Sequence, residues 1–186
     1  MTTDLRARRG RIFLTGFMGC GKSTIGPILA NSIGYQFVDL DRLIEDRNGK
    51  SVKRIFQEEG ERFFRDEELA VLEELAGRDR LVVALGGGTL AEPAAFATIV
   101  HAGILVYLKV PPDDLLKRLQ HKTDRPLLMD EHGNRLPEAA LRARMMELFT
   151  RRAPLYERAD VIVFADEQRL GLTVDHIVRM LSPVLK

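Results

Sequence analysis

The sequence contains no tryptophan, one cysteine, and no apolar run that approaches the ~20 residues of a membrane-spanning helix. A single cysteine excludes an intrachain disulfide and suits a reducing compartment, so we expect a cytoplasmic protein. The net charge is only +1 over 186 residues, which argues against partners such as nucleic acid or an anionic membrane surface. The histidines do not have the spacing of a metal site: His101, His121, His132 and His176.

One glycine-rich stretch dominates the remaining sequence: residues 11–24 read RIFLTGFMGCGKST. Gly16, Gly21, Lys22 and Ser23 match the pattern G-x-x-x-x-G-K-[ST], between an apolar run and a helical pattern. Glycines allow backbone N–H groups to converge on phosphate oxygens, and a helix N-terminus adds a favourable dipole. The alternative is a plain glycine turn, but the pattern predicts a site for a nucleoside triphosphate.

Short apolar runs alternate with helical patterns along the whole chain. We expect strands at 12–15, 35–41, 81–85, 104–108 and 161–164, and helices at 22–33, 42–48, 52–59, 61–76, 92–101, 111–120, 138–157 and 173–181. Pro154 should bend or interrupt the helix at 138–157. Because the strands are continuous leucine and β-branched runs, the pattern indicates an α/β protein whose parallel sheet is covered on both faces.

The chain has neither an internal repeat nor a linker, so we predict one domain over residues 1–186. Residues 42–77 form a helical region that we expect to bind the substrate. The span 119–136 is polar and long for a connection, which is typical of a lid over an active site, although a disordered surface loop is the alternative.

Two acidic residues follow the second expected strand. Asp39 and Asp41 lie two residues apart, so on a strand they would point to the same side, beyond the carboxyl edge where such sheets bind ligands. One would support a metal and the other would contact a substrate. The alternative is a pair of helix-capping acids near Arg42.

The third expected strand runs into Gly86, Gly87 and Gly88, where many phosphate-loop enzymes carry a metal-binding acid. We therefore expect Asp39 to supply the missing carboxylate. Three glycines also indicate that a ligand approaches this backbone closely, with a flexible turn as the alternative.

Three arginines are candidates for binding an anion. Arg65 shares a helix face with Glu61 and Glu68, which alone would suggest a solvated salt-bridge ladder. Arg125 lies in the expected lid, where it could neutralise charge on a phosphoryl group. Arg152 lies in the last long helix, two residues before Pro154.

Taken in order, these motifs resemble the shikimate kinase family. They are Gly16-Phe-Met-Gly-Cys-Gly-Lys-Ser-Thr24, Asp39-Leu-Asp41, Gly60-Glu61-x-x-Phe64-Arg65-x-x-Glu68, Gly86-Gly87-Gly88, Arg125-Pro-Leu-Leu128 and Arg152-x-Pro-Leu-Tyr156. The resemblance implies a three-layer P-loop kinase fold with strand order 2-3-1-4-5, similar to nucleoside monophosphate kinases. It also implies transfer of the ATP γ-phosphoryl group to the 3-hydroxyl of shikimate, on the way to chorismate and aromatic amino acids.

The resemblance implies a role for each substrate-side residue. In the family, arginines that match Arg65 and Arg152 hold the shikimate carboxylate, which a planar guanidinium grips better than an ammonium group. The acid that matches Asp41 accepts hydrogen bonds from the substrate hydroxyls, so we expect an orienting acid first and a general base second. The other residues expected to meet the substrate are Gly86, Gly87 and Gly88.

On the nucleotide side, Lys22 and Arg125 match the positive charges on the transferring phosphoryl group, and with Asp41 they form the predicted catalytic set. Ser23 and Asp39 match the residues around one Mg²⁺ ion. The full set predicted to bind ATP is Gly19, Cys20, Gly21, Lys22, Ser23, Thr24, Arg118, Arg125 and Arg169, with Arg118 packing on adenine.

Two departures from the family pattern are visible. Cys20 replaces a small alanine or serine, and the span 119–135 is somewhat long, so lid contacts beyond Arg125 stay open. A P-loop kinase of gluconate or of a nucleoside monophosphate is the nearest alternative. A GTP-dependent switch is another, although the chain has no N-K-x-D segment to read guanine. The family suggests a monomer.

Overall fold

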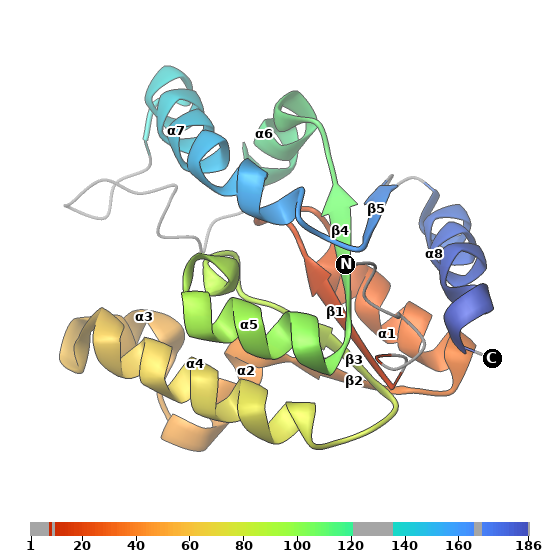
Figure 1. The fold of residues 1–186 in the computed structure, drawn as a ribbon. Coiled ribbons are helices and arrows are strands. Elements are labelled where there is room, and N and C mark those ends of the chain that lie inside the picture. Colours follow the sequence, from red (N-terminus) through yellow and green to blue (C-terminus); the bar gives the residue numbers. More distant parts are fainter. Residues whose placement is uncertain (1–7, 9, 121–135, 166–168, 186) are drawn as a thin grey trace.

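The computed structural model describes residues 8, 10–120, 136–165 and 169–185. Within them, one sheet contains five strands: β1 Arg11–Thr15, β2 Gln36–Asp39, β3 Leu81–Ala84, β4 Ile104–Lys109 and β5 Val161–Phe164. Their order is β2-β3-β1-β4-β5 and every neighbouring pair is parallel (Figure 1). The expected parallel sheet and its 2-3-1-4-5 order are therefore confirmed.

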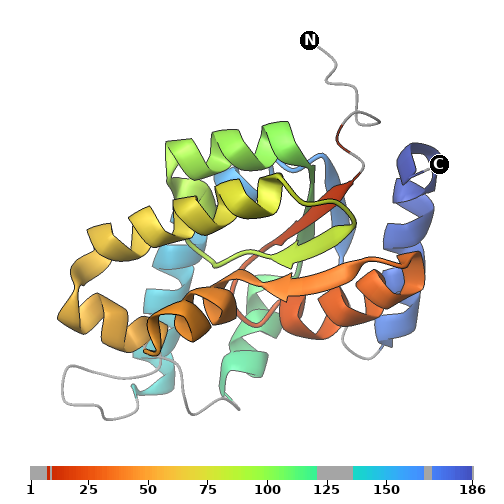
Figure 2. The same ribbon diagram turned by 90° about the horizontal axis from the view of Figure 1, so that it is seen from below.

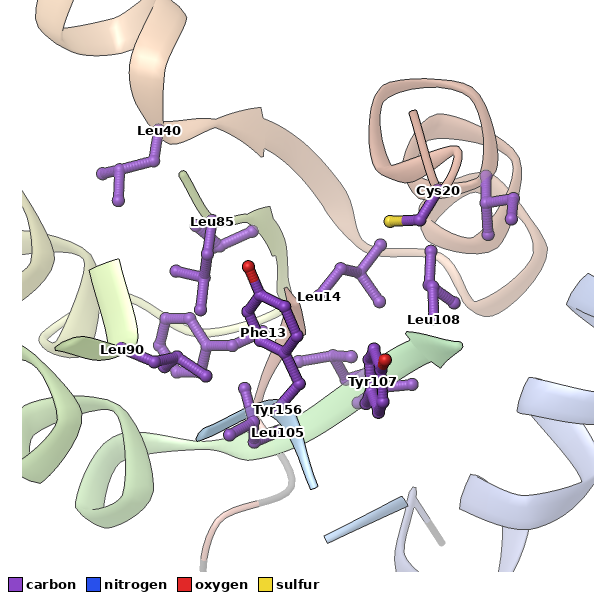
Figure 3. Packing of buried hydrophobic residues seen from close by; sticks show 14 of the residues in the cluster. Phe13, Leu14, Cys20, Leu40, Leu85, Leu90, Leu105, Tyr107, Leu108 and Tyr156 are labelled. Atoms are coloured by element: carbon purple, nitrogen blue, oxygen red, sulfur yellow. The ribbon is translucent and has the colours of Figure 1, made fainter. Parts of the chain in front are cut away.

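The strands differ in burial according to their place in the sheet. Nearly every residue of β1, β3 and β4 is buried, as expected for strands that helices cover on both faces. The edge strands are more exposed, and Phe164 at the end of β5 leaves 70% of its surface in solvent. The central side chains form one apolar cluster, part of which is drawn in Figure 3.

Helices lie on both faces of the sheet. They are α1 Lys22–Ile33, α2 Leu40–Asn48, α3 Val52–Glu58, α4 Gly60–Ala76, α5 Pro93–Ala102, α6 Pro112–Gln120, α7 Glu138–Tyr156 and α8 Leu170–Leu185. Helices α1 and α8 cover one face, and α5 with part of α4 covers the other (Figure 2). Helices α2, α3 and α4 pack together beside the β2 edge. No helix of the described part is long and apolar enough to cross a membrane.

The register of the central strands aligns the segments that carry the predicted site. Leu14 of β1 pairs with Ala84 of β3, and Ala84 pairs with Asp39 of β2. All three strands therefore end at the same level of the sheet. The phosphate-loop motif, the two acids and the three glycines consequently begin side by side, although more than 60 residues separate the first from the last.

The expected strand at 35–41 is wrong at its end, because β2 stops at Asp39 and α2 begins at Leu40. The Asp39 carboxylate accepts a hydrogen bond from the backbone N–H of Arg42 at 3.3 Å, which caps the helix. Asp41 therefore lies in the first turn of α2. The inference that two strand positions place Asp39 and Asp41 on the same side does not hold.

Other boundaries were closer to expectation. Gly34 ends α1 with a φ of 70° and Ser51 caps α3 by accepting the N–H of Arg54, both as predicted. Helix α7 is not interrupted at Pro154, because only two residues follow it in the helix and Tyr156 is anchored in the core. Helix α8 is longer than expected, and a short 3₁₀ turn, η2 Thr89–Ala91, was missed.

A partly buried ion pair joins the start of the described chain to the residue before β5. Nη1 and Nη2 of Arg8 donate to Oδ1 and Oδ2 of Asp160 at 3.0 and 2.8 Å, and Arg8 is only 5% exposed. The same carboxylate accepts the backbone N–H of Leu105 at 2.8 Å. Asp160 thus pairs one buried cation and one backbone donor at the entry to β4 and β5.

We predict that Asp160→Ala lowers the free energy of unfolding by about 2 kcal/mol, because it removes the carboxylate that pairs with Arg8 and accepts the Leu105 N–H, and leaves Arg8, among the described residues, only the Gly103 carbonyl. Urea denaturation would measure the change. Asp175→Ala, on the exposed face of α8, is the control and should change stability by less than about 0.5 kcal/mol. Equal denaturation midpoints for the two variants would contradict the assignment.

Candidate active site

The phosphate-loop motif folds as a tight turn whose backbone requires glycine. Gly16, Gly19 and Gly21 have φ values of 141°, 82° and 102°, in the left-handed region that other residues avoid. Lys22 begins α1, and its Nζ donates to the carbonyl oxygen of Gly16 at 2.7 Å. The lysine is therefore held over the loop, next to the first N–H groups of a helix, as an anion site requires.

Ser23 and Asp39 meet across the gap between α1 and β2. The Ser23 hydroxyl donates to Oδ2 of Asp39 at 2.9 Å, while Oδ1 of Asp39 receives the N–H of Arg42. Asp39 is thus both a helix cap and a partner of the phosphate loop. The two alternatives for Asp39 are therefore compatible, because Oδ1 caps α2 and Oδ2 contacts Ser23.

Asp41 lies deeper, at the start of the glycine loop. A Cβ built on Gly86 would come within 2.7 Å of its Oδ1, so any side chain at position 86 would collide with this carboxylate. Burial raises the pKa of Asp41 from 3.8 to about 6, with further contributions from the negative charges of Asp39 and Glu68, while Lys22 opposes the rise. Asp41 therefore changes charge close to neutral pH.

Two arginines bracket the end of the glycine loop. A Cβ on Gly88 would lie 2.9 Å from Nη2 of Arg65 and 3.4 Å from Nη2 of Arg152. A Cβ on Gly87 would lie 3.1 Å from Nη1 of Arg152. The absence of side chains at 87 and 88 therefore lets the two guanidinium groups approach the backbone. This close approach is a physical reason for the glycines, which sequence could only suggest.

Arg65 is anchored by two carboxylates of unequal character. Glu68 is 1% exposed; its Oε2 accepts from Nη1 of Arg65 at 2.8 Å, and its Oε1 accepts the Thr89 hydroxyl at 2.5 Å. Glu61 is exposed and bonds Nη2 of Arg65 at 3.2 Å. Of the solvated salt bridges that the sequence suggested for Arg65, only the one to Glu61 lies at the surface. On the inner side of Arg65, a buried acid ties the arginine to the turn that follows the glycines.

The remaining predicted residues are spread more widely. Nη1 of Arg118 on α6 donates to the Gly19 carbonyl at 3.2 Å, so this arginine lies against the phosphate loop. Arg169 is exposed immediately before α8, and Thr24 is exposed on α1. Cys20 is buried, with its Sγ 3.7 Å from Nζ of Lys22. Arg125 and most of the predicted lid lie outside the described residues.

Sequence reasoning did not place three contributors in the site: Glu68, Thr89 and Tyr156. Glu68 and Tyr156 each end one of the family motifs, but neither was assigned a role in the site. Tyr156 donates its hydroxyl to the Gly87 carbonyl at 2.8 Å. Its spacing from Arg152 was a second signal, because residues four apart share a helix face.

Comparison with known proteins gives a consistent family assignment. The family model described as shikimate kinase matches residues 18–182. A curated relative named shikimate kinase, from Chlorobium chlorochromatii, is 51% identical over 94% of this chain and 92% of its own length. One from Chlorobaculum tepidum is 49% identical over 92% of this chain and 90% of its own.

The chain belongs to the shikimate kinase family. This confirms the resemblance drawn from the motifs.

Solved structures agree with the family and with its P-loop kinase fold. A shikimate kinase from Bacteroides thetaiotaomicron superposes with a TM-score of 0.85 at 33% identity, covering 93% of this chain and 98% of that one. The Acinetobacter baumannii shikimate kinase, solved in complex with shikimate, gives 0.81 at 34%, covering 95% and 96%. A gluconokinase from Sinorhizobium meliloti, at 0.56 and 22%, covering 96% and 94%, shares the fold.

The raised pKa of Asp41 carries a prediction about stability. Because the folded state binds the Asp41 proton more tightly than the unfolded state, stability is present below pH 4 and is lost as pH rises to about 6. A shift of about two units corresponds to about 2–3 kcal/mol, so Asp41→Asn should stabilise the ligand-free protein at pH 8 by about 1–2 kcal/mol. The gain should shrink at pH 4.5.

Urea denaturation at both pH values measures this difference. Asp46→Asn is the matched control, since it makes the same change at an exposed position of α2 and should show no such pH dependence. An Asp41→Asn protein that is equally or less stable than the parent at pH 8 would show that the carboxylate is not under electrostatic strain.

Proposed function

We propose that this chain is a shikimate kinase, which transfers the γ-phosphoryl group of ATP to the 3-hydroxyl of shikimate and releases shikimate 3-phosphate and ADP. The observation that carries the proposal is the arrangement around Gly88. Two guanidinium groups bracket a bare backbone next to a buried acid, at the sheet edge where the phosphate loop begins. That arrangement suits a small hydroxylated carboxylate, and the reaction would serve the synthesis of chorismate and aromatic amino acids.

Arg65 and Arg152 are assigned to the substrate carboxylate. Their nitrogens lie within 3.4 Å of the same built Cβ, so one small anion at Gly88 can reach both. Asp41 is assigned to the substrate hydroxyls, including the one that attacks. With a pKa of about 6 it is mostly ionised at pH 7–8, so it accepts hydrogen bonds and can take up the hydroxyl proton late in the transfer. Gly86, Gly87 and Gly88 supply the backbone surface.

The phosphate loop is assigned to the nucleotide. Backbone N–H groups between Gly19 and Thr24 are assigned to the phosphates, although those of Cys20 and Thr24 also donate to the Phe17 and Gly21 carbonyls. Lys22 would exchange its bond to the Gly16 carbonyl for a phosphate oxygen. Arg118 packs on adenine from its position against the loop. Arg125 and Arg169 complete the set, Arg125 as a charge on the transferring phosphoryl group. Positioning and charge neutralisation then supply most of the catalysis.

The residues present fit one Mg²⁺ ion at Ser23 and Asp39. A hydroxyl and a carboxylate oxygen 2.9 Å apart are ligand types that Mg²⁺ accepts. Within the described residues, no group of three or more His, Cys, Asp or Glu side chains could hold a metal. Such a sparse site suits Mg²⁺, which keeps several waters and binds phosphate oxygens. The ion would neutralise charge on the phosphates, and Asp39 would hold it through water.

The domain plan follows from these assignments. One domain over residues 1–186 would act as a monomer, as the family suggests, in the cytoplasm, whose reducing conditions suit a chain with one cysteine. The region 42–77 would carry the substrate-binding helices. The span 119–136 would serve as a lid that excludes water during transfer.

A coupled assay for ADP release tests the activity. We expect turnover with ATP, Mg²⁺ and shikimate, and at least about a hundredfold lower kcat/KM with gluconate or with nucleoside monophosphates, because the two arginines select a carboxylate beside hydroxyls in one geometry. Preference for gluconate or a nucleotide acceptor would refute the proposal. Tighter binding of GTP than of ATP, with no phosphoryl transfer to any acceptor, would instead favour a GTP-dependent switch protein.

Arg65→Ala should raise the KM for shikimate by at least about tenfold and leave the KM for ATP within about twofold, since the lost bond is to the carboxylate. Steady-state kinetics with each substrate varied in turn measures the two constants. Arg62→Ala removes an exposed arginine from the same helix and serves as the matched control. Equal changes in both KM values would mean that Arg65 does not contact the substrate carboxylate.

A further inference from the structure

We propose that Tyr156 is a positioning residue, whose hydroxyl sets the direction of the peptide between Gly87 and Gly88 and thereby aims the Gly88 N–H at the acceptor substrate. This inference rests on the proposed function of the site. It assigns a role in recognition to a side chain that lies in the core and contacts no substrate.

The glycine loop needs an external support. Three consecutive glycines have no side chain to pack and a large conformational entropy, so their peptide planes must be held by hydrogen bonds. The Gly86 carbonyl accepts the N–H of Thr89 at 3.3 Å, and the Gly88 carbonyl accepts the N–H of Ala91 at 2.9 Å. Both bonds belong to the local turn. The carbonyl between them, that of Gly87, accepts the Tyr156 hydroxyl at 2.8 Å.

The geometry of the peptide bond turns this contact into a directional constraint. In a planar trans peptide the C=O of one residue and the N–H of the next point in opposite directions. A Gly87 carbonyl directed at Tyr156 therefore directs the Gly88 N–H away from the core. Gly88 is the residue that the two guanidinium groups bracket, so this N–H belongs to the same surface.

Tyr156 is itself rigidly held. It is 1% exposed, and its ring lies 5.3 Å from the ring of Tyr107 on β4 in a tilted arrangement. Figure 3 shows both tyrosines within the buried cluster. Burial raises the pKa of the Tyr156 hydroxyl well above its usual value, so the hydroxyl remains a donor throughout the working pH range.

The helix connects this support to the substrate arginine. Tyr156 and Arg152 are four residues apart on α7, so both point to the same side and both meet the glycine loop. The hydroxyl thus fixes the loop relative to the helix that carries Arg152. Loss of the Tyr156 hydroxyl would free the Gly87–Gly88 peptide to rotate and would also remove the hydroxyl's interaction with the Arg152 side chain.

Tyr156→Phe tests the inference, because it keeps the ring and its packing and deletes the hydroxyl that donates to Gly87. We expect the KM for shikimate to rise about five- to tenfold, as for a lost hydrogen bond that leaves a buried acceptor unpaired, with the KM for ATP within about twofold. Tyr107→Phe deletes the hydroxyl of the neighbouring ring and should leave both constants within about twofold. Thermal unfolding of both variants accompanies the kinetics.

A second measurement needs no variant. In protein labelled with ¹⁵N-glycine, saturating shikimate should shift the Gly88 amide resonance while ADP leaves it unchanged. A shikimate KM unchanged in Tyr156→Phe, equal rises in both KM values, or an unshifted Gly88 amide would each overturn the inference. Absence of shikimate turnover in the parent protein would instead refute the proposed function, so the two failures are distinguishable.

Discussion

Parallel pairing of β2, β3 and β1 in one register is the constraint on which the site depends. Asp39, Ala84 and Leu14 lie opposite one another, so three segments leave the sheet at one level. The phosphate loop, the acids and the glycine loop therefore begin side by side, and the Ser23–Asp39 hydrogen bond joins the first two. Their separation along the chain is bridged by hydrogen bonds of the sheet, which the buried apolar strands stabilise. A change of register in β2 would move the acids away from the other two segments.

The site brings together three carboxylates, those of Asp39, Asp41 and Glu68. Burial raises the pKa of Asp41, and the negative charges of Asp39 and Glu68 raise it further. Glu68 is buried with two donors, Arg65 and Thr89, so its charge is compensated by hydrogen bonds. In the proposed function, the further partners of Asp41 are the substrate hydroxyls. The carboxylate that burial destabilises would then be the one that meets the reactants, as expected where function and stability conflict.

Sequence predicted the parts of this structure that depend on local chemistry. The glycine pattern around Lys22 predicted a phosphate loop, and continuous apolar strands predicted the parallel sheet; family resemblance supplied its strand order. Asp41 was assigned to the right edge for the wrong reason, because Asp39 caps α2 and ends the strand two residues early. Periodicity carries no information on which side-chain oxygen will capture a backbone N–H. Glu68 looked like a surface ladder residue, because burial depends on Thr89 and the turn packed above it.

The glycine loop shows why such residues escape sequence reasoning. A loop that must admit a ligand to its backbone cannot carry side chains, so its conformation has to be imposed by groups elsewhere in the chain. Here those groups are Glu68 through Thr89 on one side and Tyr156 on the other. Glu68 and Tyr156 are both buried, and although each ends a family motif, the motif does not show that the side chain supports the glycine loop. Because α7 supplies Arg152 and Tyr156 together, one helix would set, under the proposed function, both the charge that attracts the substrate and the peptide that orients it. Precision at the site would then come from core residues that hold a backbone, while the residues that touch the substrate would provide charge and hydrogen bonds.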